Sequence, residues 1–166
     1  MYGERHRAKR TGQIGGQRGY TFVEVAIVAA IIAILASAVL PLAKVTIQRN
    51  REIELRRALR EMRTAIDKYK DAADQNLIAE PPITAEGYPP TLETLVEGAP
   101  AANDTTGKKL RYLRRIPRDP MTKSTEWGMR SSRDDANSKA WGGQNVYDVY
   151  TKYDGTALDG TKYTDW

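Results

Sequence analysis

The 166-residue chain is predicted to adopt an α+β fold, with one long N-terminal helix packed by its distal half on a small C-terminal antiparallel β-sheet. Three features predict this. An uncharged run at 25–43 is followed by an apolar stripe of helical spacing at 55–73. Two β-rich segments, 125–130 and 146–151, come late in the chain. Helix first and strands afterwards, rather than an alternation of both, is typical of α+β proteins.

The first half of the predicted helix, residues 20–43, is apolar on nearly every side. Its uncharged run covers 19 residues, 25–43, which is roughly 28 Å of helix and close to the ~30 Å core of a bilayer. Pro41 lies inside the run, where a proline removes a backbone donor at a cost of about 3 kcal/mol in an isolated helix. We predict a membrane-spanning helix here, with at least a kink at Pro41.

The same helix is predicted to continue as an amphipathic half, residues 44–76. Arginine and acidic residues occupy most of its faces, with Arg63–Asp67 spaced as an i,i+4 pair. A coiled coil would use the same apolar stripe, but the stripe lasts for under three heptads. We therefore expect it to pack on the protein's own C-terminal domain. The stripe recurs at intervals of 4, 3, 4, 3 and 4 residues, at Leu55, Leu59, Met62, Ile66, Tyr69 and Ala73.

Residues 77–124 are predicted to be a connecting region. Two proline pairs at 81–82 and 89–90 exclude a continuous helix. Between the second pair and Gly98, a short helix capped by Thr91 fits the sequence. Residues 101–109 are predicted to be a polar loop. The region ends in an Ile-Pro-Arg-Asp-Pro corner, and the C-terminal β-sheet and its last loop follow at 125–166.

Charge and composition argue against several function classes. The net charge of +5 comes from 26 basic and 21 acidic residues, but residues 1–19 hold five basic residues and one acidic residue. The remaining 21 and 20 give about +1, so a basic nucleic-acid-binding surface is not expected. The chain has no cysteine, and its single histidine is His6. This excludes thiol chemistry and cysteine-based metal sites, and it excludes a catalytic triad with a histidine beyond residue 19. We therefore expect that the protein is not an enzyme.

The most specific motif lies where the predicted helix begins. A basic leader, residues 1–19, ends at Gly19 and is followed by Tyr-Thr-Phe-Val-Glu, so that Glu24 stands at the start of an apolar segment. A charged group costs about 3 kcal/mol at the centre of a membrane helix, somewhat less near its end, and generally marks function. Two other interpretations stay open: an ordinary single-span anchor, and a secretory signal peptide cleaved after Ala36-Ser37-Ala38.

These residues resemble the class III signal of type IV pilins and type II secretion pseudopilins. The resemblance implies that a prepilin peptidase cuts between Gly19 and Tyr20 and that the new amine of Tyr20 is methylated. It also makes Glu24 the fifth residue of the mature chain, with a role in assembly. The family usually begins with phenylalanine, so Tyr20 departs from the pattern. Pro41 falls where many members carry a proline that loosens the helix, which implies unwinding during assembly.

The C-terminal half resembles the major pseudopilin (protein G) family of type II secretion. Met121-Thr122 departs from that pattern, where Trp-Gly is common. The lack of cysteine favours a pseudopilin over a pilin with a C-terminal disulfide. The residues that carry the resemblance are a proline corner followed by two aromatic strands: Leu113, Pro117, Asp119, Pro120, Trp127 and Tyr147-Asp148-Val149-Tyr150.

A candidate calcium site lies in the loop after the last predicted strand. Asp154 and Asp159 both precede glycines there. Calcium prefers carboxylate and carbonyl oxygens, although Asp-Gly is also common turn chemistry. Members of the protein G family bind calcium in this region with two aspartates and backbone carbonyls. The resemblance therefore implies that Asp154 and Asp159 hold calcium.

The function implied by the resemblance is structural. The chain would be a subunit of a type II secretion pseudopilus, polymerising through its N-terminal helix to drive protein export across the outer membrane. Implied partners are further copies of the chain, minor pseudopilins, the prepilin peptidase and an inner-membrane assembly platform. The chain would cross the inner membrane once, with its C-terminal domain in the periplasm. The alternatives are the major subunit of a type IV pilus, a DNA-uptake binding subunit or a membrane-anchored enzyme.

Overall fold

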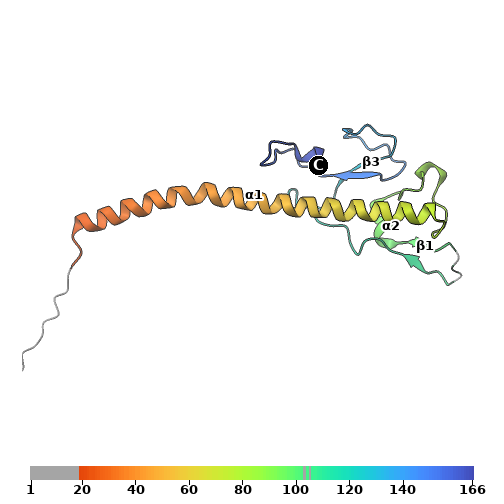
Figure 1. Ribbon diagram of the computed structural model, residues 1–166, viewed down its shortest axis with the longest axis horizontal. Helices are drawn as coiled ribbons and strands as arrows, with labels where there is room; N and C mark the ends of the chain where they lie inside the picture. The colour runs from red at the N-terminus through yellow and green to blue at the C-terminus, as the bar shows by residue number, and fades with distance from the viewer. Residues whose placement is uncertain (1–18, 103, 105) are drawn as a thin grey trace, which may run out of the picture. The chain divides into compact units, whose positions relative to one another are not determined.

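The computed structural model describes residues 19–102, 104 and 106–166, and the side chains of residues 38–42 lie outside that description. It confirms the α+β class: a long N-terminal helix precedes two small antiparallel sheets (Figure 1). The chain divides into a unit ending at Leu42 and a unit from Ala43 to Trp166. Its elements are α1 (Phe22–Asp74), the 3-10 helix η1 (Ile83–Ala85), α2 (Leu92–Glu97), β1 (Ala99–Pro100), β2 (Lys109–Leu110), β3 (Gly128–Arg130), β4 (Asp148–Tyr150) and the 3-10 helix η2 (Tyr163–Asp165).

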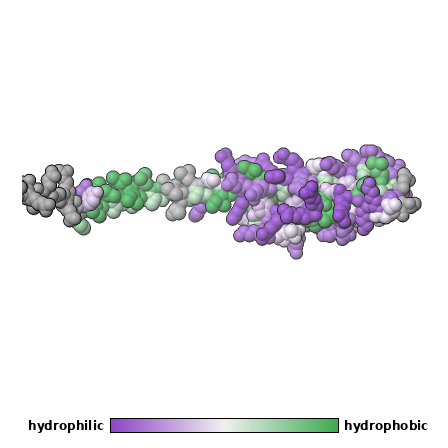
Figure 2. All heavy atoms as spheres, turned by 90° about the horizontal axis from the view of Figure 1, so that it is seen from below, coloured by the Kyte–Doolittle hydropathy of each residue, from purple (hydrophilic) through white to green (hydrophobic). Residues whose placement is uncertain are grey.

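The first unit exposes its large apolar side chains along α1, and Figure 2 shows this hydrophobic stretch. Among the residues with described side chains, no helix is long and apolar enough to cross a membrane. The predicted span, 20–43, includes residues 38–42, whose side chains lie outside the description. The helix continues through the position of Pro41, so the predicted loosening there stays a prediction. The exposed side chains are Phe22, Val23, Val25, Ile27, Val28, Ile31, Ile32, Ile34 and Leu35.

The end of α1 is a Schellman motif, two residues before the predicted end of the helix. Asn76 has a positive φ of 52°. The backbone N–H of Leu77 donates to the carbonyl of Ala72 at 2.9 Å, and that of Asn76 donates to Ala73 at 3.0 Å. These two bonds satisfy carbonyls that the last helical turn would otherwise leave without partners. Asparagine tolerates the left-handed conformation better than most residues, so it ends this helix in place of glycine.

The core of the second unit forms around the predicted apolar stripe of α1. Five of the six stripe residues are buried, and Ala73 is partly buried at the margin. Ala58, Ala65 and Ala72 widen the stripe and let neighbouring segments approach the helix closely. The prediction that the stripe packs on the chain's own domain is therefore confirmed. The partners that cover it include Ile78, Leu92, Leu95, Leu113, Trp127, Val146, Val149 and Tyr163.

The connecting region contains more regular structure than predicted. The helix α2 is confirmed, and its cap Thr91 accepts a hydrogen bond from the backbone of Thr94 at 3.4 Å. The prediction of a polar loop at 101–109 missed the strands on either side of it: β1 and β2 pair with Ala99 opposite Leu110. Each of these strands has only two residues, which is too short for a period-2 pattern. In Figure 1, α2 and β1 lie on one side of α1, and β3 lies on the other.

The second sheet corresponds to the two predicted strands, in shorter form. β3 and β4 pair antiparallel, with Gly128 opposite Tyr150 and Arg130 opposite Asp148. The Tyr150 ring lies across Gly128, where a Cβ atom would come within 2.3 Å of the ring. Arg130 covers the same ring: its guanidinium carbon is 4.1 Å from the ring centroid. An aromatic residue opposite a strand glycine is a known device for holding register.

Replacing Gly128 by alanine should therefore destabilise the second unit by about 1–3 kcal/mol, because the added methyl group displaces the Tyr150 ring. Chemical denaturation followed by circular dichroism measures this loss. Gly107 is the control, since a Cβ there meets no atom within 4 Å, although its φ of 78° adds a local strain of its own. A Gly128→Ala protein as stable as the unsubstituted chain would contradict the packing described here.

Candidate functional site

The predicted processing site is an exposed, non-helical segment directly before α1. Gly19 and Tyr20 are both exposed and lie outside any helix or strand. A Cβ placed on Gly19 would meet no atom within 4 Å. Exposed segments outside helices and strands are where proteolytic cleavage concentrates, so cleavage between Gly19 and Tyr20 stays a prediction that this exposure is compatible with. The rest of the leader, residues 1–18, lies outside the described residues.

Thr21 caps the helix that begins at Phe22. Its hydroxyl oxygen accepts a hydrogen bond from the backbone N–H of Glu24 at 3.2 Å, and its carbonyl accepts from Val25 at 3.1 Å. Thr-x-x-Glu is the sequence signal of a capping box, although this cap was not among the predicted features. The cap fixes the helix start so that Glu24 lies in the first turn. An acidic side chain is favourable there because the helix dipole is positive at this end.

The carboxylate of Glu24 makes no ion pair or side-chain hydrogen bond within the described part of the chain. It is exposed, and so are the apolar side chains around it. An unpaired carboxylate on an apolar helix is a strong acceptor for a cation as soon as the helix leaves water. Cleavage before Tyr20 would create such a cation four residues away.

The predicted proline corner is built around a buried carboxylate. Asp119 is 0% exposed. Its side chain accepts a hydrogen bond from the hydroxyl of Thr151 at 2.5 Å and another from the backbone N–H of Met121 at 2.7 Å. The indole N–H of Trp127 donates to the carbonyl of Pro117 at 2.9 Å. These contacts tie the corner to the chain just beyond β4 and just before β3.

A second network joins α1 to β4 and corrects a predicted pair. Arg63 does not pair with Asp67 but with Asp148, where Nε lies 2.7 Å from Oδ1. Arg130, 8% exposed, approaches the other carboxylate oxygen of Asp148 at 3.4 Å and donates to the carbonyl of Thr164 at 3.2 Å. The half-buried Asp148 accepts from two arginines, which is a stronger arrangement than an exposed i,i+4 pair on a helix.

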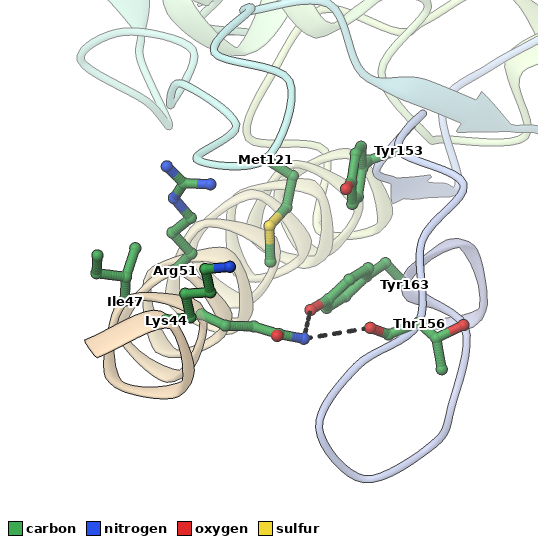
Figure 3. Close-up of a pocket in the computed structure, with 8 residues that line it drawn as sticks. Lys44, Ile47, Arg51, Met121, Tyr153, Thr156 and Tyr163 are labelled. Carbon is green, nitrogen blue, oxygen red and sulfur yellow. Dashed lines mark hydrogen bonds between the residues drawn. The ribbon is translucent and has the colours of Figure 1, made fainter. Parts of the chain in front are cut away.

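A pocket of about 400 Å³ lies between α1 and the C-terminal loop (Figure 3). Gln48 crosses it, and its amide nitrogen donates to Tyr163 Oη at 3.0 Å and to the carbonyl of Thr156 at 3.3 Å. Lys44 and Arg51 stand at its edge, and Met121 and Tyr153 contribute apolar surface. None of its lining residues is a carboxylate, cysteine or histidine. At this pocket, hydrogen bonds from Gln48 hold the C-terminal loop against α1.

Beside this pocket, Glu52 is a buried carboxylate that was not among the predicted site residues. Its Oε1 accepts from the hydroxyl of Tyr163 at 2.7 Å and from the backbone N–H of Leu158 at 2.9 Å. Burial, followed by the hydrogen bond to Glu52, raises the pKa of the Tyr163 hydroxyl. Only the position of Glu52, next to the apolar stripe and four residues after Gln48, hinted that it faces the domain.

The two predicted calcium ligands do not form a common donor set. Asp159 accepts two hydrogen bonds from Thr161 and pairs with Arg56 at 3.1 Å. The bonds from Thr161 and the charge of Arg56 lower the pKa of Asp159. Asp154 lies 4.0 Å from the ammonium group of Lys139. Within the described residues, no three His, Cys, Asp or Glu side chains gather as a metal site would require. Calcium binding stays a prediction that these contacts do not favour.

Comparison with known proteins bears on the N-terminal segment. Searches of curated proteins and of solved structures each found no match. Residues 14–40 match the family model of the prokaryotic N-terminal methylation motif. This match includes the leader end, Gly19, Tyr20, Glu24 and most of the apolar run. The motif marks type IV pilin-like proteins and implies processing by a prepilin peptidase and membrane-anchored assembly into a filament.

Proposed function

We propose that this protein is a structural subunit of a type II secretion pseudopilus and not an enzyme. In this role the peptidase releases residues 1–19, and the chain waits in the inner membrane with its second unit in the periplasm. It then polymerises through the first half of α1. Minor pseudopilins and an inner-membrane assembly platform would start and drive this polymerisation.

The observation that carries the proposal is the exposed apolar surface of α1 behind a processing motif. Phe22 is 87% exposed, and every large apolar side chain described up to Leu35 is at least half exposed. Apolar surface of that extent needs a cover, because water disfavours it. Lipid covers it before assembly, and the same segment of neighbouring copies covers it afterwards. A repeated head-to-tail contact that does not close produces a filament.

The choice of a secretion pseudopilus over a surface pilus rests on the C-terminal half. The buried Asp119 corner and the β3–β4 pair use the residues that resemble the protein G family. The second unit holds its C-terminal loop with polar contacts to α1, without any disulfide. The genes beside this one test the choice. Secretin and secretion-ATPase genes alone indicate secretion, whereas retraction-ATPase and minor-pilin genes indicate a pilus and would overturn it.

The processing step is tested directly by the intact mass of the protein extracted from membranes. With the peptidase present, we expect a chain that begins at Tyr20 and carries one additional methyl group. Replacing Gly19 by a bulky residue should leave the chain uncut, because the peptidase of the families that this motif resembles cuts after a glycine. Gly107, in an exposed loop, is the control position. A chain that begins at Val39 would identify a secretory signal peptide instead, and an uncut chain would leave only a membrane anchor.

A further inference from the structure

The C-terminal loop, residues 154–166, is held by side chains from one face of α1. Gln48, Glu52 and Arg56 follow one another at intervals of four residues, so they project from successive turns on the same side of the helix. Gln48 and Glu52 make the contacts beside the pocket described above. Arg56 reaches the part of the loop that the sequence predicted to bind calcium.

Arg56 belongs to a closed ring of four side chains. Its Nη2 lies 3.1 Å from Asp159 Oδ2, and its guanidinium carbon lies 4.0 Å from the centroid of the Trp166 ring. The indole N–H of Trp166 donates to the hydroxyl of Thr161 at 2.7 Å. That hydroxyl donates to Asp159 Oδ1 at 2.6 Å, which completes the ring. Each member therefore contacts two others.

We propose that the guanidinium of Arg56 neutralises Asp159 and orders the C-terminal loop, so that the loop needs no divalent ion. A planar guanidinium pairs with a carboxylate through its edge and covers an aromatic ring with its face. Both contacts are made here by one side chain. A calcium ion would need six to eight oxygen ligands, yet both oxygens of Asp159 already accept hydrogen bonds, from Arg56 and from Thr161.

The ring acts together with the neighbouring contacts of Arg63 and Glu52. The Arg63 guanidinium donates to the backbone carbonyl of Trp166, and Glu52 holds the other end of the loop through Leu158. Arg56 and Asp159 are 54% and 49% exposed, so their ion pair alone contributes little. The effect of Arg56 is therefore local: it orders residues 159–166 against α1. This inference concerns the folding of the second unit and holds whether or not the chain forms filaments.

The test uses the full chain in detergent, with thermal unfolding and hydrogen exchange of the 154–166 segment as readouts. The unsubstituted protein is expected to melt at the same temperature in millimolar calcium and in chelator. Arg56→Ala should lower the melting temperature by about 2–4 °C, as expected for an exposed pair plus a cation–π contact. It should also speed exchange within 154–166 about fivefold, with a smaller change in β3 and β4. Arg57→Ala, which removes an equal charge from the next exposed position, should do neither.

Asp159→Asn tests the same ring from the other side. If Arg56 and Asp159 act as one unit, the double variant should lose no more than the larger of the two single losses. Two results would overturn the proposal. A melting temperature of the unsubstituted protein several degrees higher in calcium than in chelator would show that a metal ion orders the loop. Equal exchange of the 154–166 segment in the Arg56→Ala and Arg57→Ala proteins would show that the Arg56 guanidinium does not order the loop.

Discussion

Glu24→Ala is expected to leave cleavage before Tyr20 intact and to abolish filaments. Cleavage gives Tyr20 a cationic amine, and Glu24 carries an anion four residues further along. Each charge is costly in an apolar environment unless it is paired. The carboxylate has no partner within the described part of the chain, so the amine of its own subunit or of a neighbour is the available cation. Without Glu24, every added subunit would bury an unpaired ammonium.

Electron microscopy of sheared or overproduced filaments, together with intact mass, measures this effect. The expected loss of filaments is at least a hundredfold, because an uncompensated buried charge costs about 3–5 kcal/mol per subunit. Glu54→Ala is the matched control, since it removes an exposed carboxylate further along α1 that has no ion pair among the described residues. Filaments in normal yield from the Glu24→Ala protein would contradict the assembly role.

Asp119→Ala is expected to cause the largest loss of stability in the second unit, about 2–4 kcal/mol. The carboxylate is buried and accepts from Thr151 and from the backbone of Met121. Alanine leaves both donors without acceptors, and each unsatisfied buried group costs about 1–3 kcal/mol. The corner would then separate from β4, and Trp127 would lose its fixed position beside Pro117.

Urea denaturation followed by tryptophan fluorescence measures this loss, because the burial of Trp127 depends on the corner. Asp135→Ala is the control, since that side chain is exposed and makes no ion pair within the described residues. Asp119→Asn should retain part of the stability, because its amide oxygen still accepts one of the two hydrogen bonds. An Asp119→Ala protein within about 0.5 kcal/mol of the unsubstituted chain would mean that the corner is not a structural anchor.

Local sequence signals predicted the helices and the corner well. The apolar stripe from Leu55 to Ala73 identified the face of α1 that packs, because helical periodicity depends only on spacing along the chain. Thr91 identified the start of α2 because a cap is a contact between residues three apart. The strands β1 and β2 were missed because two-residue strands are defined by their partner and not by a pattern of their own.

The sequence by itself determined the α+β class, the N-terminal methylation motif at 14–40, and the face of α1 that packs, because each depends on composition or on spacing over a few residues. Only the tertiary structure decided which charges meet. Arg63 pairs with a residue 85 positions away, and Arg56 with one 103 positions away. The bond between Glu52 and Tyr163 spans 111 positions. An arginine on a helix has several possible acidic partners nearby in the sequence. Its actual partner here is a carboxylate or an aromatic ring that is distant in the sequence, and only the fold places that group beside the arginine.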